Sequence, residues 1–185
     1  MKLDMSLTTE NEKALINNLK AAKKGDNAAF QLLINENRLS LYRVAKGILK
    51  NEEDVADAIQ ETIINTYCGI KNLRKEEYFK TWLIKILINE CNKIWYSKSK
   101  VIPMEEVRNE YEVYEDSYSN NEVLSTVNLL TEDMRVVILL YYYEDFSIKT
   151  ISKILNIAQG TVKSRLSRAR ENLNELLTEG SIVNE

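Results

Sequence analysis

The chain has 185 residues, with 25 Lys and Arg against 28 Asp and Glu, a formal net charge of −3. Five glycines and one proline are far below average usage, which excludes collagen-like, low-complexity and turn-rich all-β chains. There is no histidine, and Cys68 and Cys91 have no CxxC spacing, so histidine-based acid–base chemistry is excluded and a zinc site is disfavoured. We expect both thiols to be reduced and buried or half-buried. The longest uncharged apolar stretch, Val136 to Tyr143, is too short to span a bilayer, and residues 1–12 hold no apolar segment of a signal peptide.

Charge divides the chain into three pieces. Residues 1–98 hold 16 basic and 13 acidic side chains, residues 99–121 hold 2 and 6, and residues 122–185 hold 7 and 9. The middle piece contains the only proline, Pro103, and no apolar periodicity. We therefore predict an all-α protein in which a flexible acidic linker, 99–121, joins two helical domains, 1–98 and 122–185.

The N-terminal piece predicts four or five helices. The first ends at Gly25, and Asp26 or Asn27 caps the second, whose apolar pattern continues beyond Asn37. Asn51 caps the next helix, whose apolar residues are Val55, Ala58, Ile59, Ile63 and Tyr67. The last runs from about Glu76 to Lys98, and along one side it carries Phe79, Trp82, Leu83, Ile86, Leu87, Glu90 and Ile94.

The C-terminal piece predicts a helix-turn-helix. Thr131 caps one helix, and Ser147 caps a short helix over Ile148–Leu155. Three residues, 156–158, then separate it from a longer helix that opens at Gln159. One face of the longer helix packs against the domain through Val162, Leu166, Ala169, Leu173 and Leu176.

The longer helix carries four basic residues and no acid between Gln159 and Arg170. Such a helix can neutralise phosphates and place side chains at base edges in a major groove. We expect Thr161, Ser164, Arg165 and Arg168 on the face opposite the packed one. The candidate DNA-binding residues are Thr161, Lys163, Ser164, Arg165, Ser167, Arg168 and Arg170. The alternative is a solvated basic face on an ordinary bundle helix.

These motifs make the sequence similar to a known family. Residues 129–141, 146–152 and the string GTVKSRLSRAR at 160–170 closely resemble region 4 of the extracytoplasmic-function (ECF) sigma factors. These are the smallest members of the sigma-70 family, the promoter-recognition subunits of bacterial RNA polymerase. The resemblance implies that the helix-turn-helix reads the −35 element as duplex DNA.

The N-terminal piece resembles region 2 of the same family at residues 26–30, 54–62 and 79–89. Within 54–62, three carboxylates share one helix face, beside Gln60, because Asp54, Asp57 and Glu61 are spaced i, i+3 and i+7. Paired carboxylates can perform acid–base chemistry, but an exposed face supplies neither a pocket nor a shifted pKa. A docking site for a basic partner fits better, and the resemblance assigns Asp54, Asp57, Gln60 and Glu61 to the β′ coiled coil of the polymerase clamp. The alternative is a solvated acidic stripe.

Residues 71–100 hold eight basic and three acidic side chains, interleaved with aromatics. Basic side chains beside aromatic rings suit the binding of single-stranded DNA, because the charges follow the backbone and the rings stack with unpaired nucleobases. The resemblance assigns −10 melting to this segment, and the candidates are Lys80, Trp82, Lys85, Asn89, Lys93, Trp95 and Tyr96. We expect Trp82 to be mostly packed and Trp95 and Tyr96 to be exposed. Many family members have an Asp and an Arg where this chain has Lys93 and Tyr96.

The function implied is promoter-specific initiation of transcription, with no catalytic residue, cofactor, metal or small-molecule substrate in this chain. The expected partners are core RNA polymerase through its β′ clamp coiled coil and β flap, promoter DNA that is double-stranded at −35 and single-stranded at −10, and an anti-sigma factor, often membrane-anchored. The expected location is the bacterial cytoplasm. One alternative is a two-domain helix-turn-helix regulator that binds an operator without polymerase. A helical hydrolase using Asp54, Asp57 and Glu61 lacks histidine, a glycine-rich loop and metal spacing.

Overall fold

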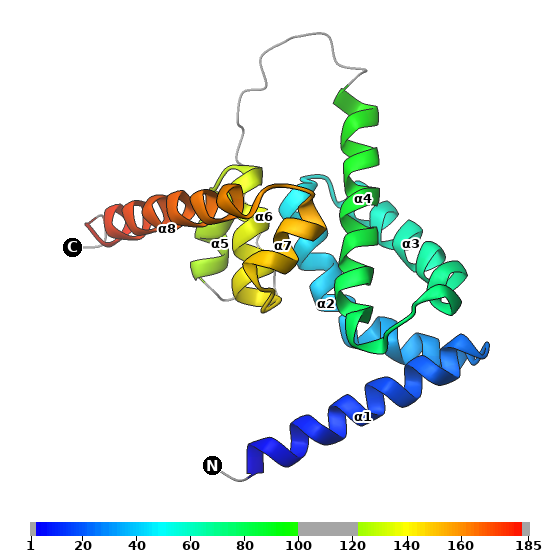
Figure 1. Cartoon of the computed structure of the whole chain (residues 1–185). Helices are drawn as coiled ribbons and strands as arrows, with labels where there is room; N and C mark the ends of the chain where they lie inside the picture. The colour runs from blue at the N-terminus through cyan, green and yellow to red at the C-terminus, as the bar shows by residue number, and fades with distance from the viewer. Residues whose placement is uncertain (1–2, 100–121, 183–185) are drawn as a thin grey trace. The chain divides into compact units, whose positions relative to one another are not determined.

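A computed structural model describes the backbone of residues 3–99 and 122–182. The chain divides into two compact units, Met1–Cys91 and Asn92–Glu185, and the boundary falls inside a continuous helix. Every regular element in the described ranges is helical, which confirms the all-α class with two helical domains (Figure 1). Residues 100–121 of the predicted acidic linker lie outside the described residues, and the predicted domain limits stay predictions. None of the described helices has the length and hydropathy of a membrane span.

The first unit begins with a helical hairpin (Figure 1). Its turn follows Lys23, and Gly25 has φ +97°, a left-handed conformation that glycine adopts without a Cβ clash. The side chain of Asp26 accepts a hydrogen bond of 3.1 Å from the Ala29 backbone N–H and caps the second helix. The elements of this unit are α1 (Leu3–Lys23), α2 (Asn27–Ile48), α3 (Glu52–Gly69), two 3₁₀ turns, η1 (Ile70–Asn72) and η2 (Glu76–Tyr78), and the start of α4 (Phe79–Ser99).

Helix α2 runs unbroken through Asn37. The Asn37 side chain is buried and its Nδ2 donates a 2.8 Å hydrogen bond to the Leu33 carbonyl, one turn earlier. The apolar runs on either side of Asn37 therefore belong to one helix. Within residues 3–99 there are four α-helices, the lower of the two predicted numbers.

The buried faces of α3 and α4 differ from the predicted ones. In α3, Thr62 and Thr66 are fully buried while Tyr67 is half exposed, and Thr62 Oγ1 is satisfied by the Ala58 carbonyl at 2.6 Å. In α4 the predicted residues Phe79, Leu83, Leu87 and Glu90 are buried, whereas Trp82, Ile86 and Ile94 are half-buried and Ile84, Ile88 and Cys91 are buried in addition. The rotation in α4 has a simple cause: residues 82–88 are apolar at every position except Lys85, so periodicity does not single out one face. Cys91 is buried as predicted, but Cys68 is exposed, because α3 buries its Thr62–Thr66 side and Cys68 lies on another side of the helix.

The second unit contains the remainder of α4 and the helix-turn-helix. After α5 (Glu122–Asn128), α6 (Glu132–Ile138) continues into a π-helical turn, η3 (Leu139–Tyr143). Thr131 stands at the N-cap of α6 without the predicted side-chain hydrogen bond. Ser147 caps α7 (Ile148–Leu155) as predicted, and α8 (Gln159–Ile182) follows. Helix α8 lies against α5, α6 and α7 (Figure 1).

Candidate nucleic-acid interface

The turn between α7 and α8 is fixed by a serine and a left-handed asparagine. Asn156 ends α7 with φ 54° and ψ 45°, a conformation that asparagine tolerates better than most residues. The Ile157 backbone N–H donates to the Ser152 carbonyl at 3.1 Å, and Ser152 Oγ donates back to the Ile157 carbonyl at 2.6 Å. This reciprocal pair sets the angle at which α8 leaves the turn.

Helix α8 has a buried stripe and an exposed face on opposite sides. Val162, Leu166 and Ala169 are at most 2 % exposed, and burying each of the two larger side chains stabilises the unit by about 1.5–3 kcal/mol. The α8 outer face consists of side chains that are all exposed: Lys163, Ser164, Ser167 and Arg168. Thr161, another candidate, is half-buried. The structure thus brings two basic and two hydroxyl side chains together on one accessible face.

Arg165, which we expected on the face opposite the packed one, lies instead on one flank of the buried stripe, and Arg170 lies on the other flank. Arg165 Nη2 donates to Asp133 Oδ2 at 2.7 Å, which ties α8 to the first turn of α6. On the opposite flank, Arg170 Nε donates to the Tyr142 hydroxyl at 2.9 Å. The Arg170 guanidinium also lies 5.9 Å and 5.8 Å from the ring centroids of Tyr141 and Tyr142. The three partners of these arginines are supplied by α6 and η3 and carry no signal in the sequence pattern of α8 itself.

In α4, five candidates form one stripe opposite the buried face. Their spacing of i, i+3, i+7, i+11 and i+14 places them in line along the helix. The α4 outer stripe consists of Trp82, Lys85, Asn89, Lys93 and Tyr96. All of these are exposed except Trp82, which is half-buried.

The other two α4 candidates lie off this stripe. Lys80 is half-buried and lies on the inner side of the helix. Trp95 is 45 % exposed, beyond the last buried residue, and its ring meets the Tyr96 ring edge-to-face at 5.0 Å between centroids. The Trp95–Tyr96 pair therefore extends the stripe with a second exposed aromatic surface.

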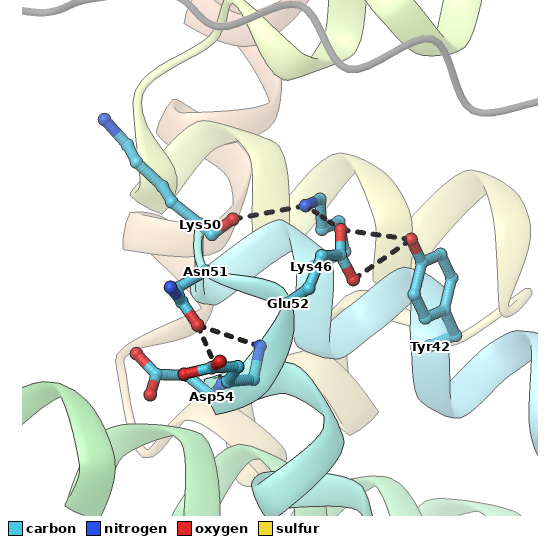
Figure 2. A network of polar contacts seen from close by, with 7 residues as sticks. Tyr42, Lys46, Lys50, Asn51, Glu52 and Asp54 are labelled. Carbon is cyan, nitrogen blue, oxygen red and sulfur yellow. Dashed lines mark hydrogen bonds and ion pairs between the residues drawn. The ribbon is translucent and has the colours of Figure 1, made fainter.

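The acidic candidates lie on α3. Asp57, Gln60 and Glu61 are exposed, and Asp54 is half-buried. Asn51 positions the start of this helix, since its Oδ1 accepts from the backbone N–H groups of Glu53 and Asp54 at 2.8 Å and 3.1 Å (Figure 2). The exposed residues Asp57, Gln60 and Glu61, with Asp54 at their edge, form the α3 acidic face.

The first acid of α3 has a different role from those on the acidic face. Figure 2 shows Glu52 between Lys46 and Tyr42 of α2, where it forms an ion pair with the Lys46 ammonium. Lys46 also donates to the Lys50 carbonyl at 3.1 Å, and the Tyr42 hydroxyl lies 3.4 Å from Glu52 Oε1. Glu52 thus joins α3 to the end of α2. Across the part of the chain that is described, no cluster of three or more Cys, Asp or Glu residues has the arrangement of a metal site.

Two family models match the chain in the order of these surfaces. The model for Sigma-70 region 2 matches residues 33–100, which include α3 and α4. The model for Sigma-70, region 4, matches residues 120–173, which include the helix-turn-helix. Each surface described above falls inside one of the two matches.

Relatives and solved structures agree with these matches. The ECF RNA polymerase sigma-E factor of Haemophilus influenzae is 30% identical over 166 residues, 80% of this chain and 87% of its own length. The ECF RNA polymerase sigma factor SigW of Bacillus subtilis is 30% identical over 176 residues, 86% and 94% of the two chains. The solved structure of the sigma factor RpoE from Bartonella quintana, in complex with the anti-sigma factor NepR, is similar with a TM-score of 0.65 and 25% identity, covering 80% of this chain and 96% of that one. CnrH, solved with the cytosolic domain of CnrY, has the same fold, with a TM-score of 0.62, 21% identity and coverage of 90% and 98%. The chain belongs to the extracytoplasmic-function RNA polymerase sigma factors of the sigma-70 family.

Proposed function

We propose that this protein directs core RNA polymerase to promoters by placing α8 in the major groove of the −35 element. The α8 outer face carries this proposal. Two basic side chains and two serine hydroxyls are exposed there, directly opposite a fully buried apolar stripe. The helix that carries them follows a three-residue turn. Basic side chains on such a face neutralise phosphates, and Arg or Ser at its centre reaches base edges.

The α4 outer stripe is proposed to hold the melted −10 strand. Lys85 and Lys93 supply charge along the strand, Asn89 between them supplies an amide for a base edge, and the Trp95–Tyr96 pair supplies rings for stacking. Lys80 is half-buried on the inner side of α4 and is not part of this stripe.

The α3 acidic face is proposed to dock on the β′ clamp coiled coil of core polymerase, and the second unit on the β flap. Asp57 and Glu61 are exposed carboxylates one turn apart, which suits a basic protein surface. Synthesis of RNA then belongs to the polymerase, and this chain contributes binding and promoter opening without cofactor, metal or catalytic residue.

Control by an anti-sigma factor is part of the same proposal. The Bartonella quintana relative, 25% identical, was solved bound to an anti-sigma factor. We propose a partner of this class for this chain, and the bacterial cytoplasm as its place of action, with attachment to the membrane only through that partner.

Two substitutions separate the two surfaces. Arg168→Ala should weaken −35 recognition by about 1–3 kcal/mol per lost base contact and leave affinity for core polymerase unchanged. Asp57→Lys should lower affinity for core polymerase before it affects −35 recognition. Binding to core is measured by fluorescence anisotropy of the labelled full chain, and −35 recognition by competition between promoter fragments for the reconstituted holoenzyme. Lys24→Ala, at an exposed position in the turn after α1, and Glu36→Lys, at an exposed position of α2, are the charge-matched controls. Loss of core binding in Arg168→Ala, or unchanged core binding in Asp57→Lys, contradicts the assignment.

A further inference from the structure

Arg165 differs from the basic residues of the α8 outer face in having an anionic partner of its own. Its Nη2 lies 2.7 Å from Asp133 Oδ2, and its side chain is 26 % exposed. Lys163 and Arg168 are exposed and make no ion pair within the described residues. The helix therefore presents two kinds of basic residue: exposed residues without an ion pair in the described structure, and an arginine held in an ion pair.

The ion pair changes what the Arg165 guanidinium can do. A guanidinium has five N–H donors in a rigid planar fork, and the contact with Asp133 fixes the direction of that fork while leaving donors for DNA. The neighbouring carboxylate also offsets its charge, so attraction to phosphates, which is independent of sequence, is reduced. A hydrogen bond to a base edge depends on direction, so it gains from a fork held in place.

The partner is well placed for such a role. Asp133 belongs to α6, whose following residues, Val136 and Val137, are buried in the core of the unit. On the same flank, Asn172 Nδ2 lies 3.7 Å from the sulfur of Met134, so α8 meets the start of α6 at two points. The Asp133 carboxylate is 66 % exposed, so the ion pair lies at the surface of the unit.

We propose that Asp133 is a positioning and specificity-determining residue: it holds Arg165 so that this arginine discriminates between base pairs instead of binding phosphates indiscriminately. The inference rests on the proposed −35 function of α8. It adds a residue outside the helix-turn-helix to the determinants of promoter choice.

The test compares the wild-type full chain with Asp133→Asn, Asp133→Glu and Glu132→Gln, each as reconstituted holoenzyme. A pool of promoter duplexes randomised at −35 is selected, and affinity for the selected sequence and for an unrelated duplex is then measured over a range of salt. Glu132→Gln makes the same change of charge in the same helical turn and is the matched control for effects on the α6 terminus.

With Asp133→Asn we expect the ratio of specific to non-specific affinity to fall by about tenfold, mainly because binding to the unrelated duplex becomes tighter. The salt slope should steepen by about 0.9, the value for one additional phosphate contact. Asp133→Glu should restore most of the ratio, and Glu132→Gln should leave it unchanged. In an Arg165→Ala background, Asp133→Asn should have no further effect on the ratio, since Asp133 acts through that arginine.

An Asp133→Asn holoenzyme with an unchanged ratio and slope overturns the inference, as does one that loses specific and non-specific binding equally. A further loss of the ratio in the Arg165→Ala background also overturns it. If the wild-type holoenzyme selects no −35 sequence at all, the proposed function itself fails and the inference fails with it. If the wild-type holoenzyme selects a −35 motif and Asp133→Asn changes neither the affinity ratio nor the salt slope, the inference fails while the proposed function stands.

Discussion

The indole of Trp82 packs directly on the backbone of Gly69: a Cβ added to Gly69 would lie 3.0 Å from Cζ2 and 3.4 Å from Cη2 of that ring. The last residue of α3 is thus shaped to accept the first aromatic residue of the α4 outer stripe. Because Trp82 packs in this contact, the exposed rings of Trp95 and Tyr96 at the far end of α4 are better suited to bind DNA.

Gly69→Ala should destabilise the first unit. Overpacking against the indole costs about 1–3 kcal/mol, and the better helix propensity of alanine offsets up to about 1 kcal/mol of it. In a Trp82→Phe background the ring atoms nearest Gly69 are absent, so the same substitution should become neutral or stabilising. Urea unfolding of the four proteins of this cycle measures the coupling. Equal effects of Gly69→Ala in both backgrounds would contradict the packing account.

Replacing the exposed aromatic pair should impair promoter opening. Trp95→Ala or Tyr96→Ala removes a stacking surface worth about 1–3 kcal/mol per base, so open-complex formation should fall by roughly 5- to 150-fold. Trp95→Phe keeps a ring and should retain most of the activity. Permanganate reactivity of unpaired thymines at a promoter selected by the wild-type holoenzyme reports opening. Wild-type opening by Trp95→Ala would rule out a stacking role for this ring.

The left-handed turn residue of the helix-turn-helix gives a matched pair of variants. Asn156→Gly should leave the free energy of unfolding almost unchanged, because glycine adopts φ 54° without a Cβ clash. Asn156→Ala should cost about 1–2 kcal/mol, since alanine has neither that freedom nor the local hydrogen bonding of asparagine. Thermal unfolding compares the two, and equal stability of the alanine and glycine variants would show that the turn does not depend on this backbone conformation.

Lowering the pH should weaken one tertiary contact, the ion pair between Lys23 and Glu76. Lys23 Nζ lies 2.7 Å from Glu76 Oε1, and this hydrogen bond holds the pKa of the Glu76 carboxyl below its usual value of 4.5. Because the folded-state pKa is the lower one, the contact stabilises the fold fully above the unfolded-state pKa and loses that contribution as pH falls through the folded-state pKa.

Glu76→Gln should therefore lose less stability than the wild type when urea unfolding is repeated from about pH 7 to about pH 3. Glu77→Gln, a change at the neighbouring exposed acid, is the control and should follow the wild-type curve. Parallel pH curves for the wild type and Glu76→Gln would contradict this account of the contact.

The sequence predicts the helix starts well because their signals are local. Asp26, Asn51 and Ser147 each accept hydrogen bonds from backbone N–H groups two or three residues ahead, so their positions can be read without tertiary information. The buried faces are harder to predict. Thr62 and Thr66 are buried in place of an expected tyrosine, because which side of α3 faces the core depends on its neighbours rather than on its own pattern.

The candidate surfaces were predictable to the extent that helical periodicity defines them. Periodicity separates the buried stripe of α8 from its outer face, although Arg165, which we expected opposite the packed face, lies on one flank of the stripe and Arg170 on the other. It does not identify their partners, since Asp133 and Tyr142 lie 32 and 28 residues earlier in the chain. Only the packing of α8 on α6, which continues directly into η3, brings these groups together.

Run-off transcription with core bacterial RNA polymerase on a library of promoter fragments, with and without this protein, tests the central claim most directly. We predict transcripts that start downstream of a shared −35/−10 pair only when the protein is present. No stimulation of transcription, together with tight binding of the protein alone to a palindromic operator, would contradict the account and identify a two-domain helix-turn-helix regulator.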